Sequence, residues 1–130
     1  MRIIIDTNLW ISFLIRNDYS KLDEVLFSKT CKLIFSNELL HEFISVVKRP
    51  KFRRYFALSD VENILETINE FAEFIVVKSS IEICRDAKDN FLLSLGADSN
   101  ADFLLTGDKD LLELECFQNT KIRTITDFLI

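Results

Sequence analysis

The sequence predicts a single α/β domain in three layers, with a parallel β-sheet flanked by helices on both faces. Short apolar, β-branched runs alternate with segments in which apolar residues recur at helical spacing. That alternation is typical of βαβ units. The length of 130 residues fits one domain over 1–130, and a chain with two glycines and one proline has little material for a flexible linker.

The expected strands are short and buried. The first, over 2–5, is Arg-Ile-Ile-Ile and is apolar on both faces, as a central parallel strand is. Asp6 ends this strand. Four more strands are expected, over 32–35, 73–77, 102–105 and 122–125.

Helices are expected between these strands. The first covers 8–16, is apolar nearly all round and has Asn8 as its cap. Another runs from its cap, Ser36, to about Arg49, because Pro50 stops it. The other expected elements are a helix over about 20–29, a helix opened by the capping box Ser59–Glu62, and a helix over about 88–98. A short helix through Leu111 and Leu112 is expected after Asp108, and a closing turn over 127–130.

Four carboxylates occupy positions that a parallel sheet collects. Asp6 follows the first strand, Asp108 follows the fourth, and Asp89 lies in the first turn of the helix before the fourth strand. Glu42 lies on the border of the apolar face of its helix, at about 100° per residue. Because functional groups of such sheets gather beyond the carboxyl ends of the strands, these acids can converge.

Converging carboxylates repel one another and need a cation. A hard ion with oxygen ligands, Mg²⁺ or Mn²⁺, suits such a set. The chemistry that uses this arrangement is phosphodiester hydrolysis, and it needs no histidine or cysteine nucleophile. The chain has one histidine, His41, which is expected on the solvent side of its helix.

Each acid also has a structural interpretation. Asp6 and Asp108 could simply be a helix cap and a turn residue, and Glu42 could be solvated. Asp86 and Asp110 compete with Asp89 and Asp108 for their roles. Two other enzyme classes fit less well. A phosphatase of the haloacid-dehalogenase type would have Asp where the chain has Asn8, and a receiver domain would have Asp where it has Ser36. Two glycines exclude a Rossmann or P-loop nucleotide site.

The net charge of −5 argues against nucleic-acid binding, yet basic residues are concentrated in one place. They can form a local face toward phosphate, or a solvated helix end where cations suit the dipole. They are Lys48, Arg49, Lys51, Arg53 and Arg54.

Neither the membrane nor an oxidising compartment is indicated. No apolar run approaches the ~20 residues of a membrane span, and the N-terminus does not resemble a signal peptide, so a cytoplasmic protein is expected. Cys31, Cys84 and Cys116 have no metal-binding or disulfide spacing, and they are expected as buried thiols.

Four segments, in order and together covering essentially the whole chain, resemble the PIN domain family. They are Ile3–Asn8 with Ser12, Ser36–Phe43 with Lys48–Phe52, Arg85–Asn90, and Ala101–Leu112. The last is the most distinctive. The chain is most similar to the bacterial branch described as toxins of toxin–antitoxin pairs, related to VapC-type ribonucleases.

The resemblance implies a site and an activity. Asp6, Glu42, Asp89 and Asp108 fall on the family's four acidic positions, which bind Mg²⁺ or Mn²⁺ and cut single-stranded RNA. The polar positions beside the metal correspond to Thr7, Asn8 and Thr106. One departure is Ala87, where relatives often have proline, and it puts in doubt the loop that aims Asp86. The implied partners are RNA, a protein antitoxin and a second copy in a homodimer. A non-catalytic module that binds RNA or protein is the alternative.

Overall fold

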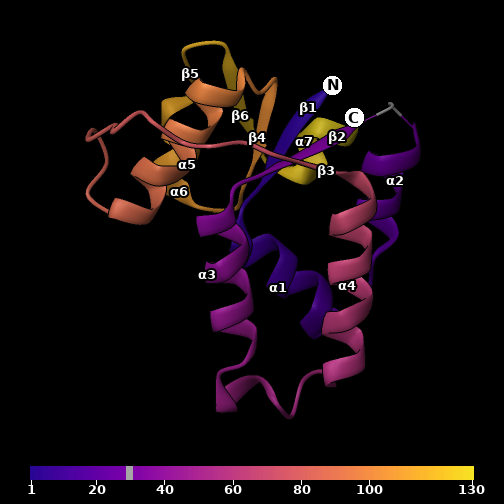
Figure 1. Ribbon diagram of the computed structural model, residues 1–130. Coiled ribbons are helices and arrows are strands. Elements are labelled where there is room, and N and C mark those ends of the chain that lie inside the picture. Colours follow the sequence, from indigo (N-terminus) through magenta and orange to yellow (C-terminus); the bar gives the residue numbers. More distant parts are fainter. Residues whose placement is uncertain (29–30) are drawn as a thin grey trace.

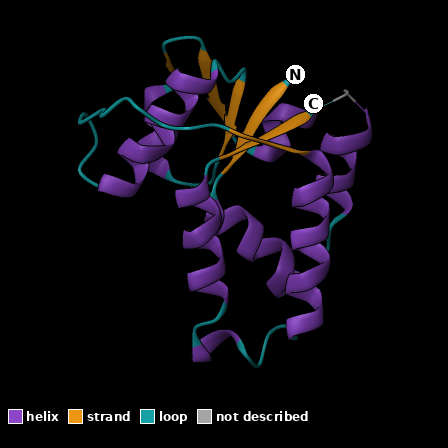
Figure 2. Cartoon of the chain, in the orientation of Figure 1, coloured by secondary structure: helices purple, strands orange, loops and turns teal. Residues whose placement is uncertain are grey.

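The computed structural model describes residues 1–28 and 31–130. Within this part of the chain, six strands form one sheet in the order β3-β2-β1-β4-β6-β5 (Figures 1 and 2). Every neighbouring pair is parallel except β5 and β6. The strands are β1 (Arg2–Ile5), β2 (Lys32–Phe35), β3 (Ala72–Phe74), β4 (Phe103–Leu105), β5 (Cys116–Phe117) and β6 (Thr120–Arg123). The predicted α/β class is confirmed.

Helices cover both faces of the sheet. In Figure 1, α5 lies in front of β4, whereas α7 lies behind the sheet and packs on α2. The long α3 and α4 extend away from the strands and are joined at their tip by η1. The helices are α1 (Thr7–Arg16), α2 (Ser20–Ser28), α3 (Asn37–Val47), the 3₁₀ helix η1 (Pro50–Phe52), α4 (Leu58–Phe71), α5 (Ala87–Ser99), α6 (Lys109–Leu114) and α7 (Ile125–Leu129).

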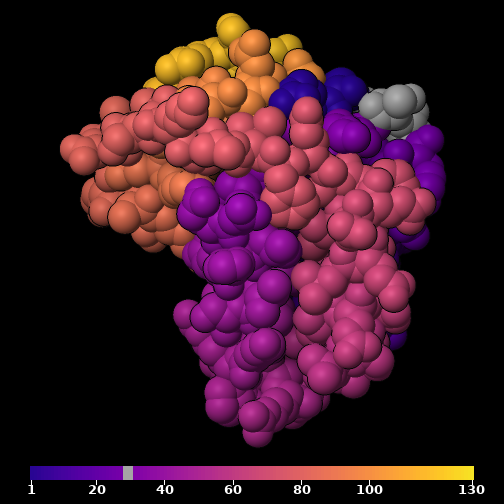
Figure 3. All heavy atoms as spheres, viewed as in Figure 1, coloured from indigo at the N-terminus to yellow at the C-terminus, as the bar shows by residue number. Residues whose placement is uncertain are grey.

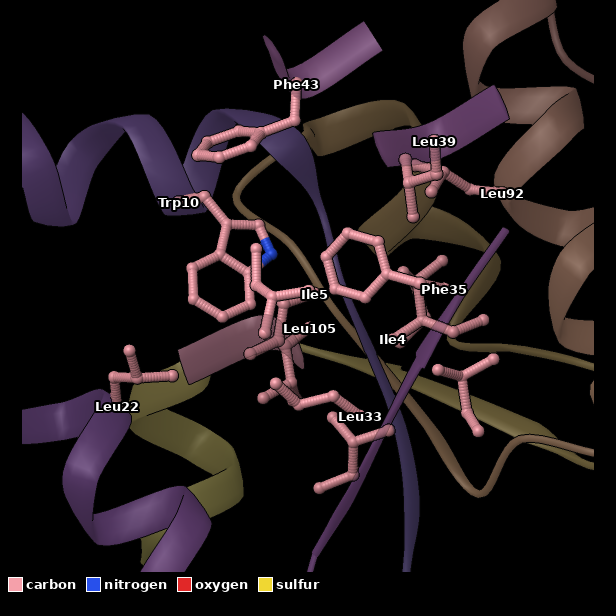
Figure 4. Packing of buried hydrophobic residues seen from close by; sticks show 14 of the residues in the cluster. Ile4, Ile5, Trp10, Leu22, Leu33, Phe35, Leu39, Phe43, Leu92 and Leu105 are labelled. Carbon is pink, nitrogen blue, oxygen red and sulfur yellow. The ribbon is translucent and has the colours of Figure 1, made fainter. Parts of the chain in front are cut away.

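An aromatic cluster fixes α1 against β2 and α3. Trp10 is 1% exposed, and its ring centroid lies 6.0 Å from that of Phe13, 6.1 Å from Phe35 and 6.3 Å from Phe43 (Figure 4). Such ring pairs add to the apolar area that they bury. This packing holds the start of α1, and with it Asp6, at the carboxyl end of β1.

Two helix starts differ from those expected. The N-cap of α1 is Asp6, whose side chain accepts a bond from Asn8 N, so the expected Asn8 cap is wrong. The capping box at Ser59 is also wrong. Helix α4 begins at Leu58, because the Asp60 carboxylate accepts a 2.9 Å bond from Ala57 N and fixes the turn there.

The C-terminal third has more structure than the apolar pattern indicates. Strand β6 ends at Arg123 because Thr124 caps α7, accepting a 3.1 Å bond from Asp127 N. The expected strand over 122–125 therefore lies two residues too late, and a helix replaces the closing turn. The hairpin strand β5 was not expected, and β3 ends at Phe74 rather than at 77. The last expected residue of the 20–29 helix lies outside the described residues.

Two general expectations are also tested. None of the three cysteines forms a disulfide, but only Cys31 is buried, Cys84 being intermediate and Cys116 exposed. Among the described residues, no helix is both long and apolar enough to cross a membrane.

Candidate metal centre

The carboxyl ends of β1 and β4 meet, and a threonine joins the acids that follow them. Asp6 N donates to Leu105 O at 3.0 Å, which aligns the two strand ends. The Thr106 hydroxyl donates to Asp6 Oδ2 at 2.8 Å and accepts from Asp108 N at 3.0 Å. Because Thr106 is 1% exposed and its hydroxyl bonds on both sides, Asp6 and the Asp108 backbone are held in one arrangement.

Three aspartates converge next to this junction. One carboxylate oxygen each from Asp89, Asp108 and Asp110 lies within 4.8 Å of the others. Asp108 and Asp110 come from the start of α6, where Asp108 Oδ1 caps the helix by accepting from Asp110 N at 2.8 Å. Asp89 comes from the first turn of α5. We call Asp89, Asp108 and Asp110 the three-aspartate group.

The Asp89 carboxylate is the most perturbed member of this group. It is 3% exposed, and its Oδ2 has no hydrogen-bond partner among the described residues. Burial raises the pKa of Asp89 to about 6, and the neighbouring carboxylates, Asp108 first, add to the rise. An isolated buried carboxylate is costly unless it is paired or binds a metal. The geometry and the charge both call for a cation here.

Asp6 is buried as well. Burial is the main cause that raises the pKa of Asp6, against the hydrogen bonds from Thr106 and Asn8 and the positive charge of Lys88. Its Oδ2 is used by Thr106, and its Oδ1 accepts only a long bond of 3.3 Å from Asn8 N. Asp6 Oδ1 therefore keeps capacity for another partner.

Glu42, the fourth predicted acid, forms an ion pair with a lysine. Glu42 Oε1 is 3.0 Å from Lys88 Nζ, and each side chain is 32% exposed. Neither Glu42 nor Asp6 belongs to the three-aspartate group, and the predicted role of Glu42 as a metal ligand stays a prediction. A second cation stands outside the group, where Arg85 Nη2 contacts both carboxylate oxygens of Asp110 at 2.9 and 3.1 Å.

The residues expected from the sequence as polar neighbours of the metal or as alternative ligands lie in different places around the three-aspartate group. Asn8 is exposed, while Thr7 is buried with no partner for its hydroxyl among the described residues. Asp86 is the N-cap of α5, accepting from Lys88 N at 2.9 Å, and is outside the three-aspartate group. Asp110, an alternative in the sequence, is inside it. A hollow of about 320 Å³ opens in front of the acids and is lined by Asp6, Asn8, Leu9, Ser12, Gly107 and Asp108.

The five predicted basic residues lie at the far tip of the α3–α4 pair. All are exposed, at the lower end of the molecule in Figure 3. Lys48 follows Glu42 by six residues, which is about 9 Å along the axis of α3.

Two cations of the centre, Lys88 and Arg85, were not singled out from the sequence. Lys88 directly precedes Asp89, and Arg85 stands in the same segment. Their position beside predicted acids was the available signal. It was weak, because exposed lysines and arginines are common and only the fold shows which acids they meet.

One divalent cation fits the three-aspartate group. Mg²⁺ and Mn²⁺ bind carboxylate oxygens at about 2.0–2.2 Å, so two oxygens on one ion lie at most about 4.4 Å apart. The three oxygens lie within 4.8 Å of one another, and a shift of a few tenths of an ångström lets them share one ion. The unpartnered Oδ2 of Asp89 supports this, because it is a buried acceptor that no described donor satisfies.

Comparison with known proteins decides the family. The profile of the PIN domain matches residues 2–110. The chain belongs to the PIN domain family. The matched range includes the carboxyl ends of β1, β2 and β4 and all of the three-aspartate group, so the acids discussed above lie within the family's own region.

Two known proteins are similar over most of the chain. Uncharacterized protein MJ1680 of Methanocaldococcus jannaschii is 30% identical over an alignment of 119 positions that covers 88% of this chain and 75% of that protein. A chain in the crystal structure of VapBC2 from Rickettsia felis, bound to a DNA fragment from their promoter, has the same fold. The TM-score is 0.61 and the identity 16%, over 95% of this PIN domain and 98% of that chain.

We expect any ion binding at Asp89 of this PIN domain to depend on pH, because burial raises the pKa of its carboxyl to about 6. We expect the Kd for Mg²⁺ to be about tenfold higher at pH 5 than at pH 7, because the ion needs the ionised carboxylate and protons compete below pH 6. Without metal, a higher pH is expected to destabilise the folded chain instead. The folded pKa lies above the unfolded value, so the free energy of unfolding falls as the pH rises from about 4 to about 6.

Isothermal titration with Mg²⁺ at the two pH values, and urea unfolding in EDTA across the same range, measure both effects. A Kd that does not change with pH, or a metal-free stability that rises through this window, would contradict the burial of Asp89.

Proposed function

We propose that this PIN domain is an endoribonuclease that cuts single-stranded RNA with Mg²⁺ or Mn²⁺. The observation that carries the proposal is the three-aspartate group, in which a buried Asp89 oxygen has no described partner. Of the four acids expected from the sequence, Asp6, Asp89 and Asp108 are proposed to act at the reacting phosphate, and Asp110 joins them as a metal ligand. Glu42 is proposed to belong to the same centre through its pair with Lys88.

The chain's residues divide the work between binding and proton transfer. Asp89, Asp108 and Asp110 would hold the ion, which when bound polarises the scissile phosphate and lowers the pKa of a bound water. Asp6 borders the hollow, and its Oδ1 can accept the proton of the attacking water. Thr106 keeps Asp6 oriented toward Asp108. Thr7 and Asn8 are proposed only as polar neighbours.

RNA binding is assigned to the hollow and to the basic tip. The hollow has Asn8 and Ser12 beside the acids, which can donate to an RNA backbone. Lys48, Arg49 and the three basic residues after Pro50 supply the positive charge that a net charge of −5 does not.

A protein antitoxin is the proposed partner, and the cytoplasm the proposed location. A hollow of about 590 Å³ between α3 and α4 is lined mainly by apolar side chains, including Phe56, Leu65 and the 66% exposed Leu58. Lys48, Arg53 and Glu62 also line it, so the hollow adjoins the basic tip. An apolar area of this kind suits a protein partner. The fold is shared with a chain of the VapBC2 structure, which supports the proposal at the level of the fold.

A cleavage assay tests the activity. The purified chain is incubated with end-labelled single-stranded RNA in Mn²⁺, in Mg²⁺ and in EDTA, beside the Asp6→Asn protein. We expect cleavage only with metal, and none above background in the variant. Metal binding with no cleavage of any RNA tested would favour the non-catalytic binding module. Growth of a bacterial host expressing either protein tests toxicity, and only the wild type should arrest it.

The basic tip gives a separate prediction. We expect the double variant Arg53→Gln, Arg54→Gln to bind RNA more weakly and with a smaller salt dependence, the slope of log K against log salt falling by roughly 1.4 if both contact phosphate. Electrophoretic mobility shifts with Asp6→Asn protein at several salt concentrations measure it, with Lys21→Gln and Lys121→Gln together as the matched control. An unaltered slope would make the tip a solvated face.

A further inference from the structure

A lysine lies beside two of the acids expected from the sequence. Lys88 Nζ is 3.0 Å from Glu42 Oε1, and the pair joins α5 to α3. Its charge also acts on the Asp6 carboxyl, which is one of the causes that lower the pKa of Asp6. Lys88 therefore serves two of the four acids expected from the sequence.

The geometry of α5 sends two neighbouring side chains to different parts of the centre. Lys88 and Asp89 are consecutive in the first turn, and consecutive helical residues point about 100° apart. Asp89 joins Asp108 and Asp110, while Lys88 meets Glu42. The start of one helix thus supplies an anion to one half of the centre and a cation to the other half.

The half of the centre that contains Asp89, Asp108 and Asp110 differs in charge from the half that contains Glu42 and Lys88. The main electrostatic influences on Asp89 are four carboxylates, namely Asp108, Asp86, Asp6 and Asp110. Among the described residues, that half has Arg85, whose 87% exposed side chain pairs with Asp110, but no cation is among the main influences on the buried Asp89 carboxyl. We therefore expect a bound ion to neutralise Asp89. The other half has its cation in the chain, because Glu42 is already paired at ion-pair distance.

Nuclease centres of this chemistry can hold two ions about 3.5–4 Å apart. We propose that the Lys88 ammonium, held in place by Glu42, fills the position of a second divalent ion, so that the three-aspartate group binds the single ion of this chain. Glu42 is then a positioning residue that acts through Lys88. This inference deepens the proposed function and rests on it for its catalytic meaning.

An ammonium can do part of the work of that ion. It has three N–H donors, and Glu42 accepts one, so an RNA phosphate oxygen can take another. It carries one positive charge instead of two and does not lower the pKa of a water as a metal ion does. Lys88 would accordingly bind and neutralise the phosphate, and the proton transfer would stay with Asp6.

The test counts ions and does not depend on cleavage. Mn²⁺ is titrated into the full chain at pH 7.5, with the unbound ion measured by electron paramagnetic resonance and the heat by calorimetry. We expect one Mn²⁺ per chain in the wild type and two in Lys88→Met, which keeps the apolar stem and removes the charge. Lys88→Gln is a second variant with the same expectation, and circular dichroism checks that both fold.

Two controls separate this account from a general loss of positive charge. Arg85→Met removes the other cation of the centre, which contacts Asp110 from outside, and should still bind one ion. Glu42→Gln should also bind one ion, with a Kd within about threefold of the wild type, because Glu42 holds the lysine and not the metal.

Three results would overturn the inference: two ions in the wild type, one ion in both Lys88 variants, or loss of ion binding in Glu42→Gln. Its failure is distinguishable from failure of the proposed function. If the wild type binds one Mn²⁺ and cuts no RNA, the proposed nuclease activity is wrong and the inference of one ion per chain still holds. If it cuts RNA and binds two ions, only the inference of one ion per chain is wrong.

Discussion

The Asp108→Asn protein is expected to cleave RNA at least about 100-fold more slowly than the wild type and to bind Mn²⁺ at least about tenfold more weakly. Asp108 supplies a charged oxygen to the three-aspartate group, and a metal centre contributes several kcal/mol to such a reaction, each 1.4 kcal/mol being about tenfold in rate. Asparagine retains the capping oxygen that α6 uses, so the fold should be preserved.

The matched control is Asp102→Asn, which loses the same charge at the amino end of β4, the end of the strand that lies away from Asp108. Asp102 precedes β4 and accepts a 2.8 Å bond from Arg2 N, a bond that asparagine can also accept. Rates from single-turnover assays with end-labelled RNA, together with calorimetric Kd values, make the comparison. Equal rates for Asp108→Asn and the wild type would remove Asp108 from the centre.

The Trp10→Ala protein is expected to lose about 3–5 kcal/mol of unfolding free energy. Trp10 is the largest of the fully buried side chains and contacts three aromatic rings, so alanine leaves a cavity at the junction of α1, β2 and α3. Urea unfolding followed by circular dichroism measures this loss, because Trp10 is the only tryptophan and fluorescence would disappear with it.

Two further variants are expected to lose less stability than Trp10→Ala. Trp10→Phe keeps an aromatic ring and removes an indole N–H that has no partner among the described residues, so it should cost less than half as much. Tyr55→Ala, at an exposed aromatic residue, should change stability by less than about 1 kcal/mol. A Trp10→Ala protein as stable as Tyr55→Ala would show that the aromatic cluster does not hold α1 in place.

The central strands and the long helices could be predicted because each has one strong pattern. The Ile3–Ile5 run is buried on both faces, and α3 has its cap at Ser36 and its apolar face at Leu39 and Phe43, as expected. The C-terminal elements failed for a physical reason. A four-residue strand followed by a capping threonine has the same composition as a longer strand, and only the Thr124 cap of α7 shows where it ends.

The site was predictable as a set of acids but not as a set of contacts. Position after a strand identified Asp6 and Asp108, because the carboxyl ends of parallel strands meet by geometry. The partner of Glu42 could not be derived, since it depends on where the fold places the start of α5 relative to α3. Asp110 could be named only as an alternative to Asp108. A residue two positions after Asp108 can point toward or away from Asp89, depending on where α6 begins.

One divalent ion bound at the three-aspartate group is the feature on which the proposed activity depends most. Crystals of the wild type grown with Mn²⁺, with diffraction recorded on both sides of the manganese edge, test it directly. We expect one anomalous peak per chain, at about 2.2 Å from oxygens of Asp89, Asp108 and Asp110. A peak between Asp6 and Glu42, or no peak at these aspartates in protein that binds Mn²⁺ in solution, would contradict the account.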